Sequence, residues 1–299
     1  MNKYFAFGMV LQSDFKIAQL LPADDGKKPD VRIVRRTLDG YGTEKGGPSV
    51  RKNEIMFSAG AVGKFRVTNG NTMEIEPGEN CPEHLLGAYI MGSGMGAVLH
   101  QRGFCPIHGS CVTDGKDAVL FIGDSGAGKS TIASEFMSNG WKFVTDDVAA
   151  VTDAETAAPL VQSSYPSQKL WQDTAERYER SGSGIHSLYM RQDREKFGVD
   201  VSEFFFDGCC RITMIVLLVR TDGPCQIGRI EGAAKIDQLI RNTYRIYMIA
   251  EEDRERHFRR CAALAGNVPM TAAARQKDVP CADRLYELII KKIGEINHG

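Results

Sequence analysis

The chain has 299 residues, a formal net charge of -1 and a hydrophobic content of 42%. This length fits one large domain or two smaller ones, with enough apolar residues for a sizeable core. The balanced charge argues against a general nucleic-acid binder, and no apolar stretch is long enough to predict a membrane span. The eight cysteines include neither a Cys-x-x-Cys pair nor a zinc-type spacing, and no signal peptide is predicted. We therefore expect reduced thiols in a cytoplasmic protein.

The N-terminal residues are rich in strand patterns and contain no recognisable catalytic constellation. Residues 4–11 are almost continuously apolar and predict one buried strand. Asn69–Asn71 separates two alternating runs and predicts a hairpin, since an Asn-Gly pair accepts the positive φ angles of a tight turn. We therefore expect a β-rich N-terminal module over residues 1–80 and a second domain over residues 81–299.

A glycine-rich turn between an apolar strand and a helix is the main functional signal. Gly123, Gly128, Lys129 and Ser130 fill the P-loop template of Gly, four residues, Gly-Lys-Ser/Thr. Glycines let backbone N–H groups close around phosphate oxygens, and the following helix N-terminus adds unpaired donors and partial positive charge. Lys129 would reach the β- and γ-phosphates, and the Ser130 hydroxyl would join the coordination of Mg²⁺. The predicted nucleotide-binding residues are Gly123, Asp124, Ser125, Gly126, Ala127, Gly128, Lys129, Ser130 and Thr131.

Two adjacent carboxylates follow the P-loop helix. The P-loop strand itself is entered through a hairpin at residues 114–116 rather than from a crossover helix. After the helix, a short strand over residues 141–145 delivers Asp146 and Asp147. We expect this strand to run parallel beside the P-loop strand, so that its carboxyl end lies at the phosphate edge of the sheet. Two carboxylates at that edge can hold Mg²⁺ and accept a proton.

Two other glycine-rich segments allow more than one interpretation. Gly92–Gly96 lies inside a helix predicted over residues 82–101, where close packing is favoured over phosphate binding because the G-x-G-x-x-G spacing is missing. Ser163–Phe197, with a short helix ending near Arg180, combines glycines with several arginines, so it is either a substrate lid or a solvated surface excursion. The α/β pattern continues with a strand over 211–219 and helices near 233–250, 251–265 and 282–296.

Three linked features resemble the HPr kinase/phosphorylase family, whose catalytic domain is similar to the nucleotide domain of phosphoenolpyruvate carboxykinase. They are His108-Gly109 before the P-loop strand, the loop wording Gly123–Ser130, and the pair Asp146-Asp147 one helix and one short strand later. The resemblance implies an α/β fold in which a P-loop kinase domain of this type, with a mixed sheet, is joined to the β-rich N-terminal module. It also implies that the carboxylate pair supports Mg²⁺ and accepts the proton of a serine hydroxyl, with the histidine beside it.

These features predict a catalytic set of His108, Lys129, Asp146 and Asp147. Alternation along a strand directs the two aspartates to opposite faces, so that one serves as the base and the other as a metal ligand. We favour Asp146 as the base, which leaves Asp147 to bind Mg²⁺ together with Ser130. His108 either orients the basic carboxylate or is a packed histidine, and both alternatives remain open.

The wider layout resembles HPr kinase homologues that occur with lasso-peptide biosynthesis genes, some of which phosphorylate the C-terminal serine of the precursor peptide. The segments that carry this resemblance are Tyr4–Phe15, His100–Gly103, Tyr165–Trp171, Glu195-Lys196 and Val268–Met270. The family's second glycine-rich signature, associated with phosphorolysis, has only a loose echo at Glu179–Ile185. This departure counts against phosphorylase activity and against HPr as the substrate.

The main hypothesis is ATP- and Mg²⁺-dependent transfer of the γ-phosphoryl group to a serine of a peptide or small protein, such as a lasso-peptide precursor. The alternatives are an HPr serine kinase, a free-serine or other small-molecule kinase, and an NTPase switch without transfer. Carboxylates directly after the P-loop helix, without a clear Walker B strand, favour transfer over a switch. We expect a peptide or small-protein partner, no nucleic-acid or membrane partner and, from the resemblance, a homo-oligomer.

Overall fold

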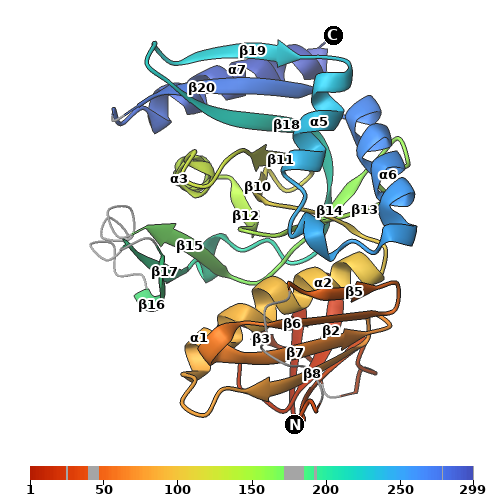
Figure 1. Cartoon of the computed structure of the whole chain (residues 1–299). Coiled ribbons are helices and arrows are strands. Elements are labelled where there is room, and N and C mark those ends of the chain that lie inside the picture. Colours follow the sequence, from red (N-terminus) through yellow and green to blue (C-terminus); the bar gives the residue numbers. More distant parts are fainter. Residues whose placement is uncertain (25, 40–46, 172–184, 192–193, 278, 299) are drawn as a thin grey trace.

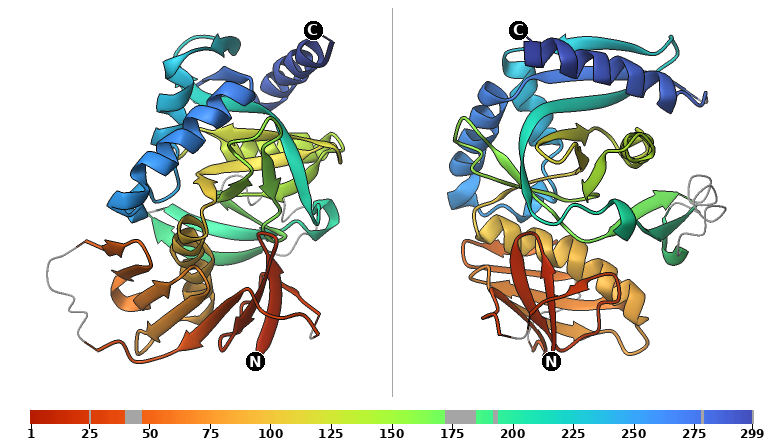
Figure 2. Two further views of the ribbon diagram at one scale, coloured as in Figure 1. Left: turned by 90° about the vertical axis from the view of Figure 1, so that its right-hand side faces the viewer. Right: turned by 180° about the vertical axis from the view of Figure 1, so that it is seen from behind.

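The computed structural model describes residues 1–24, 26–39, 47–171, 185–191, 194–277 and 279–298. The chain forms a mixed α/β structure with two large sheets and one small sheet, and its termini lie at opposite ends (Figure 1). The N-terminal sheet occupies one end, a long helical segment lies on it, and the second sheet follows (Figure 2). The predicted mixed α/β class is therefore confirmed. Within these ranges, none of the helices has the length and hydropathy of a membrane-spanning segment.

The N-terminal sheet has eight strands in the order β3-β1-β2-β4-β8-β7-β6-β5. They are β1 (Asn2–Ala6), β2 (Met9–Ser13), β3 (Leu21–Pro22), β4 (Val31–Arg35), β5 (Ser49–Arg51), β6 (Glu54–Ser58), β7 (Gly63–Thr68) and β8 (Thr72–Pro77), with a 3₁₀ turn η1 (Gly60–Val62). The predicted hairpin is confirmed, since β7 and β8 pair antiparallel around Asn69 and Gly70, whose φ angles are 52° and 61°. The prediction of one strand over residues 4–11 is wrong. Phe7 and Gly8 adopt φ angles of 55° and 72° and reverse the chain between β1 and β2. Phe7 is buried although it lies in this turn, so the apolar pattern of the sequence continues through the turn without a polar residue to mark it.

A continuous helical segment packs on this sheet. It consists of α1 (Glu83–Tyr89), a π-helical turn η2 (Ile90–Gly94) and α2 (Met95–Gln101). Its buried side chains share one hydrophobic core with the strands, and this core extends to Tyr165 and Tyr244 of the second half. A Cβ on Gly94 would lie 2.8 Å from Met73, and one on Gly96 would lie 2.9 Å from Tyr244. The glycines therefore serve close packing, which is the interpretation that the sequence favoured.

The second sheet carries the predicted nucleotide-binding loop. Its strands are β9 (Cys105–Ile107), β10 (Gly109–Thr113), β11 (Asp117–Ile122), β12 (Lys142–Thr145), β13 (Ala149–Thr152), β14 (Leu160–Gln162), β18 (Cys209–Thr221), β19 (Gln226–Ile230) and β20 (Met270–Gln276). Their order is β12-β10-β11-β18-β14-β13-β9, and β20 pairs with both β18 and β19.

β10 and β11 form the predicted hairpin, but β10 separates β12 from β11, so the expected direct pairing of β12 with β11 is wrong. Two antiparallel pairings leave β11 and β12 pointing the same way, which still brings their carboxyl ends to one edge.

Helices cover both faces of this sheet, because its central strands are apolar on both sides. They are α3 (Lys129–Ser138), α5 (Ala233–Arg241), α6 (Arg254–Asn267) and α7 (Ala282–His298), with 3₁₀ turns η4 (Ile246–Met248) and η5 (Glu251–Asp253). Val119 and Phe121 of β11 share a core with α3 and α7, whereas Leu120 and Ile122 share one with α5 and α6. The helix predicted over 233–250 is shorter than expected, because the chain after α5 turns towards the nucleotide-binding loop.

A small third sheet lies beside α3. It contains β15 (Ser167–Trp171), β17 (Arg194–Asp200) and β16 (Ile185–Arg191) in that order, and η3 (Ser202–Phe204) follows. The helix predicted to end near Arg180 falls outside the described residues. The segment Ser163–Phe197 therefore contributes a sheet next to the predicted site, and its function as a substrate lid stays a prediction.

Candidate active site

The loop between β11 and α3 has a conformation that requires glycine. Gly123, Gly126 and Gly128 have φ angles of 135°, 81° and 103°, which residues with a Cβ rarely adopt. A Cβ on Gly123 would lie 2.5 Å from the carbonyl oxygen of Leu218 on the neighbouring β18. Gly128 is the N-cap of α3, so the loop and the positive end of the helix meet at one place. This geometry is compatible with the phosphate-binding function that the sequence predicts.

Two side chains from distant parts of the sequence form hydrogen bonds with this loop, and neither was predicted. The N–H of Gly123 donates to Oδ1 of Asn242, which directly follows α5, at 2.9 Å. Arg275 of β20 donates from Nε to the carbonyl oxygen of Ala127, at 2.8 Å, and from Nη2 to that of Gly126, at 3.2 Å. No motif marks either residue, because the two contacts span 119 and 148 residues of sequence.

Lys129 and Ser130 begin α3 at the edge of the loop. Lys129 is buried, and its Nζ donates to the carbonyl oxygens of Gly123, at 2.7 Å, and of Asp124, at 3.1 Å. The ammonium group therefore lies inside the turn that the loop makes. The Ser130 hydroxyl lies 3.0 Å from Oδ1 and 3.2 Å from Oδ2 of Asp146, to which it donates. The structure thus brings three of the predicted residues together at the start of one helix.

Asp146 is held by donors from three different elements. Besides Ser130 of α3, the Ser110 hydroxyl of β10 and the backbone N–H of Lys169 on β15 donate to its carboxylate, the N–H at 2.9 Å. Asp146 is only 6% exposed. A carboxylate next to a serine hydroxyl offers the hard oxygen ligands that Mg²⁺ prefers. Ser130 and Asp146 are therefore the pair whose chemistry fits a Mg²⁺ ion, and Ser110 is a supporting residue that the sequence analysis missed.

Asp147 contacts a different set of side chains. Its φ angle of 70° places it in the left-handed region directly after β12. Its Oδ2 accepts a hydrogen bond from Nζ of Lys169, at 2.8 Å, and its Oδ1 lies 3.4 Å from Nδ1 of His108. The same nitrogen of His108 lies 3.0 Å from the Asp147 carbonyl oxygen, and because a carbonyl can only accept, Nδ1 carries a proton. The structure thus joins His108 to Asp147 and not to Asp146, which the sequence favoured as the basic carboxylate, and it adds Lys169.

His108 lies between β9 and β10 and is positioned through its backbone and its ring. Its N–H donates to the carbonyl oxygen of Asn242 at 2.7 Å, and its ring centroid lies 6.0 Å from that of Tyr244. Burial raises the pKa of the Tyr244 phenol well above its ordinary value, and the nearby Asp147 carboxylate raises this pKa further. The Tyr244 phenol is therefore uncharged at neutral pH, and its ring lies beside the His108 imidazole.

β15 contributes two polar residues that the sequence analysis did not single out. Nε2 of Gln168 donates to the Ser130 carbonyl oxygen, at 2.9 Å, and its Oε1 accepts from the Ser134 hydroxyl, at 3.1 Å. These bonds tie β15 to α3, and the next residue, Lys169, then contacts both aspartates. The available signal was an adjacent Gln and Lys directly before Leu170 in a strand, since buried polar side chains need specific partners.

No protein-family model and no curated protein matches the chain. Among solved structures, it is similar to the Hpr(Ser) kinase/phosphatase from Coxiella burnetii, at 11% sequence identity and a TM-score of 0.33. This similarity covers 64% of the present chain and 93% of that chain. A functional assignment therefore rests on the arrangement of the residues described above.

Proposed function

We propose that this protein is a kinase that uses ATP and Mg²⁺ to phosphorylate a serine hydroxyl of a peptide or small protein. The observation that carries the proposal is the contact between Ser130 and Asp146 beside Lys129, with Asp147 turned towards His108 and Lys169. A carboxylate next to a serine hydroxyl suits a metal ion, and a second carboxylate next to an imidazole suits a proton acceptor. Phosphoryl transfer to a hydroxyl group uses both functions.

In this proposal the two aspartates exchange the functions that the sequence favoured. Asp146 and Ser130 would hold Mg²⁺, because they already share a hydrogen bond and because Asp146 is the more enclosed carboxylate. Asp147 would be the base, since its side chain is 16% exposed and a bulky acceptor must reach it. Lys169 and His108 would orient the Asp147 carboxylate from two sides.

The residues of the chain account for each part of the transfer. Lys129 and the loop amides hold the β- and γ-phosphate oxygens and stabilise the negative charge that develops on them. The acceptor hydroxyl gives its proton to Asp147 while its oxygen bonds to the γ-phosphorus. The bond between that phosphorus and the β–γ bridging oxygen breaks, and ADP leaves. Bound Mg²⁺ supplies neutralisation of the phosphate charge.

The choice of acceptor is drawn from the sequence resemblance. The segment Tyr165–Trp171 resembles the homologues associated with lasso peptides, and it includes Lys169 beside the proposed base. A lasso-peptide precursor ending in serine is therefore the first acceptor to test, and an HPr-type protein and free serine are the alternatives. A cytoplasmic location and a homo-oligomeric state belong to the same proposal.

Mass spectrometry of candidate acceptors after incubation with the protein, ATP and Mg²⁺ tests the proposal. We expect a phosphate on a serine-terminated peptide, and its loss in the variants Lys129→Ala and Asp147→Asn. The variant Asp222→Asn is a matched control, because it changes a surface carboxylate that pairs with Lys277, and it should keep full activity. ATP consumption without a phosphorylated acceptor would indicate an NTPase switch, and full activity in Lys129→Ala would contradict the assignment of the loop.

A further inference from the structure

A second cluster of chemically active side chains lies where α6 packs against β9. Cys105 of β9 meets His257 and Cys261 of α6, and the ligand atoms of all three residues lie within 4.8 Å of one another. All three residues are buried. His257 and Cys261 are one helical turn apart and therefore share a face of α6, against which β9 packs. The sequence spacing did not predict this cluster, because Cys105 is contributed by a distant strand.

The distances within the cluster suit a metal with thiolate and imidazole ligands. Nε2 of His257 lies 3.4 Å from Sγ of Cys261. Tetrahedral zinc, with bonds of about 2.3 Å to sulfur and about 2.0 Å to nitrogen, separates two such ligands by roughly 3.5 Å. Oγ1 of Thr243 lies 2.9 Å from the same Nε2, and because its hydroxyl donates to the Leu239 carbonyl oxygen, at 3.0 Å, this oxygen accepts from Nε2–H. Zinc binding would therefore place the imidazole proton on Nδ1, and ligand identity and distance both fit the metal.

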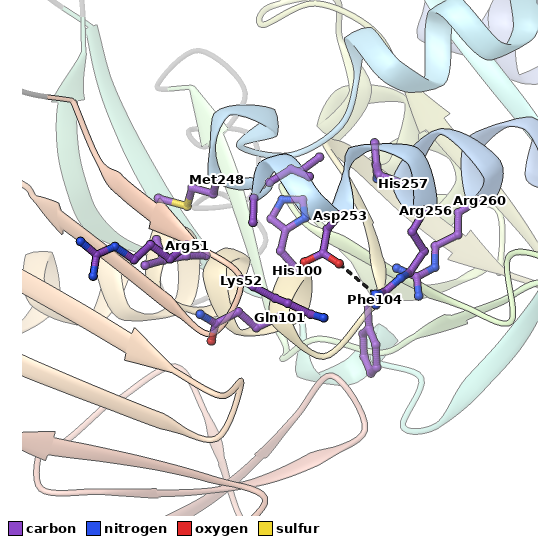
Figure 3. A pocket seen from close by; sticks show the side chains of 13 residues that line it. Arg51, Lys52, His100, Gln101, Phe104, Met248, Asp253, Arg256, His257 and Arg260 are labelled. Atoms are coloured by element: carbon purple, nitrogen blue, oxygen red, sulfur yellow. Dashed lines mark ion pairs between the residues drawn. The ribbon is translucent and has the colours of Figure 1, made fainter.

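Of the three residues in this cluster, His257 also lines a pocket. His257 lies on its wall together with His100, Phe104, Arg256 and Arg260 (Figure 3). Two of these residues are cationic but already paired, since Arg256 lies 3.0 Å from Asp253 and Arg260 lies 3.6 Å from Glu155. The positive charges beside His257 are therefore partly neutralised.

We propose that Cys105, His257 and Cys261 form a zinc-binding site separate from the candidate active site. Two thiolates and one neutral imidazole would bind Zn²⁺, with the Thr243 hydroxyl or a water molecule as the fourth ligand. Both thiol protons are released on binding, and the two negative charges balance the dication. All three protein ligands are buried, so the metal would serve structure rather than catalysis.

Zinc at this position would stabilise the elements that support the candidate active site. β9 leads directly into His108, and Thr243 stands between Asn242 and Tyr244. Asn242 accepts a hydrogen bond from the nucleotide-binding loop, and the Tyr244 ring lies beside that of His108. A metal that joins β9 to α6 would therefore restrict the movement of these residues.

Elemental analysis and cobalt substitution test the proposal on the full chain. Protein purified under reducing conditions from zinc-supplemented cells should contain about one zinc ion per chain. Replacement by Co²⁺ should give a thiolate-to-cobalt charge-transfer band. The variants Cys105→Ser and Cys261→Ser should lose this band and bind zinc at least about tenfold more weakly. Cys111→Ser, which changes a buried thiol outside the cluster, should keep both signals.

Two further measurements keep the test decisive if a serine variant folds poorly. A strong chelator should lower the melting temperature of the wild-type protein, and added zinc should restore it. Ser130→Ala should retain the zinc, which separates this site from the proposed Mg²⁺ site. Wild-type protein without zinc and without a cobalt band would overturn the proposal, as would a Cys105–Cys261 disulfide that persists under reducing conditions. None of these readouts depends on kinase activity.

Discussion

Replacement of Asn242 by alanine should loosen the nucleotide-binding loop from the rest of the domain. The side chain makes two hydrogen bonds, accepting from the Gly123 N–H at 2.9 Å and donating to the Gln238 carbonyl oxygen at 2.8 Å. Asn242→Ala removes both bonds and leaves the buried Gly123 N–H without this acceptor. An unsatisfied buried polar group costs about 1–3 kcal/mol, so we expect a loss of about 2 kcal/mol in the free energy of unfolding.

Urea unfolding followed by tryptophan fluorescence measures this loss, and ATP titration measures the accompanying weakening of nucleotide affinity. Asn139→Ala, which changes an exposed amide, should have little effect. A stability within about 0.5 kcal/mol of wild type, together with unchanged ATP affinity in Asn242→Ala, would refute the reasoning.

Three further predictions concern the surroundings of the site. Lys169→Met should reduce phosphoryl transfer more than ATP binding, because it removes an ion pair of 2.8 Å that orients Asp147. Separate measurement of kcat and of KM for the acceptor checks this. An equal loss of kcat in Lys169→Arg, which keeps the positive charge, would argue against an orienting charge. Arg275→Ala should weaken ATP affinity, since two hydrogen bonds to the loop carbonyls are lost, and calorimetry measures the change; unchanged affinity would show that the loop holds its shape without them. Burial lowers the pKa of His100 from 6.5 to about 4, so the unfolded chain binds this proton more readily than the folded protein. The contribution of His100 to the free energy of unfolding is therefore fully present above pH 6.5 and decreases as the pH falls towards 4, by up to about 3 kcal/mol. In urea unfolding at several pH values, His100→Gln should reduce this loss of stability at acidic pH.

The sequence by itself determined the features that depend on local backbone chemistry. The glycines of the loop follow from φ angles that only a residue without a Cβ adopts easily, so the loop and the start of α3 were predicted at the correct residues. The hairpin around Asn69 was predicted for the same reason. The position of the aspartate pair after a short strand was also local, because strand and turn signals extend over only a few residues.

Only the tertiary structure decided which distant groups meet. β10 separates β12 from β11, and the left-handed conformation of Asp147 leaves Asp146 as the carboxylate that contacts Ser130. Lys169 and Asn242 reach the site from other elements, and no spacing rule predicts such contacts. Strand order and side-chain partners are set by packing between segments far apart in the chain, so one sequence supplies no local signal for them.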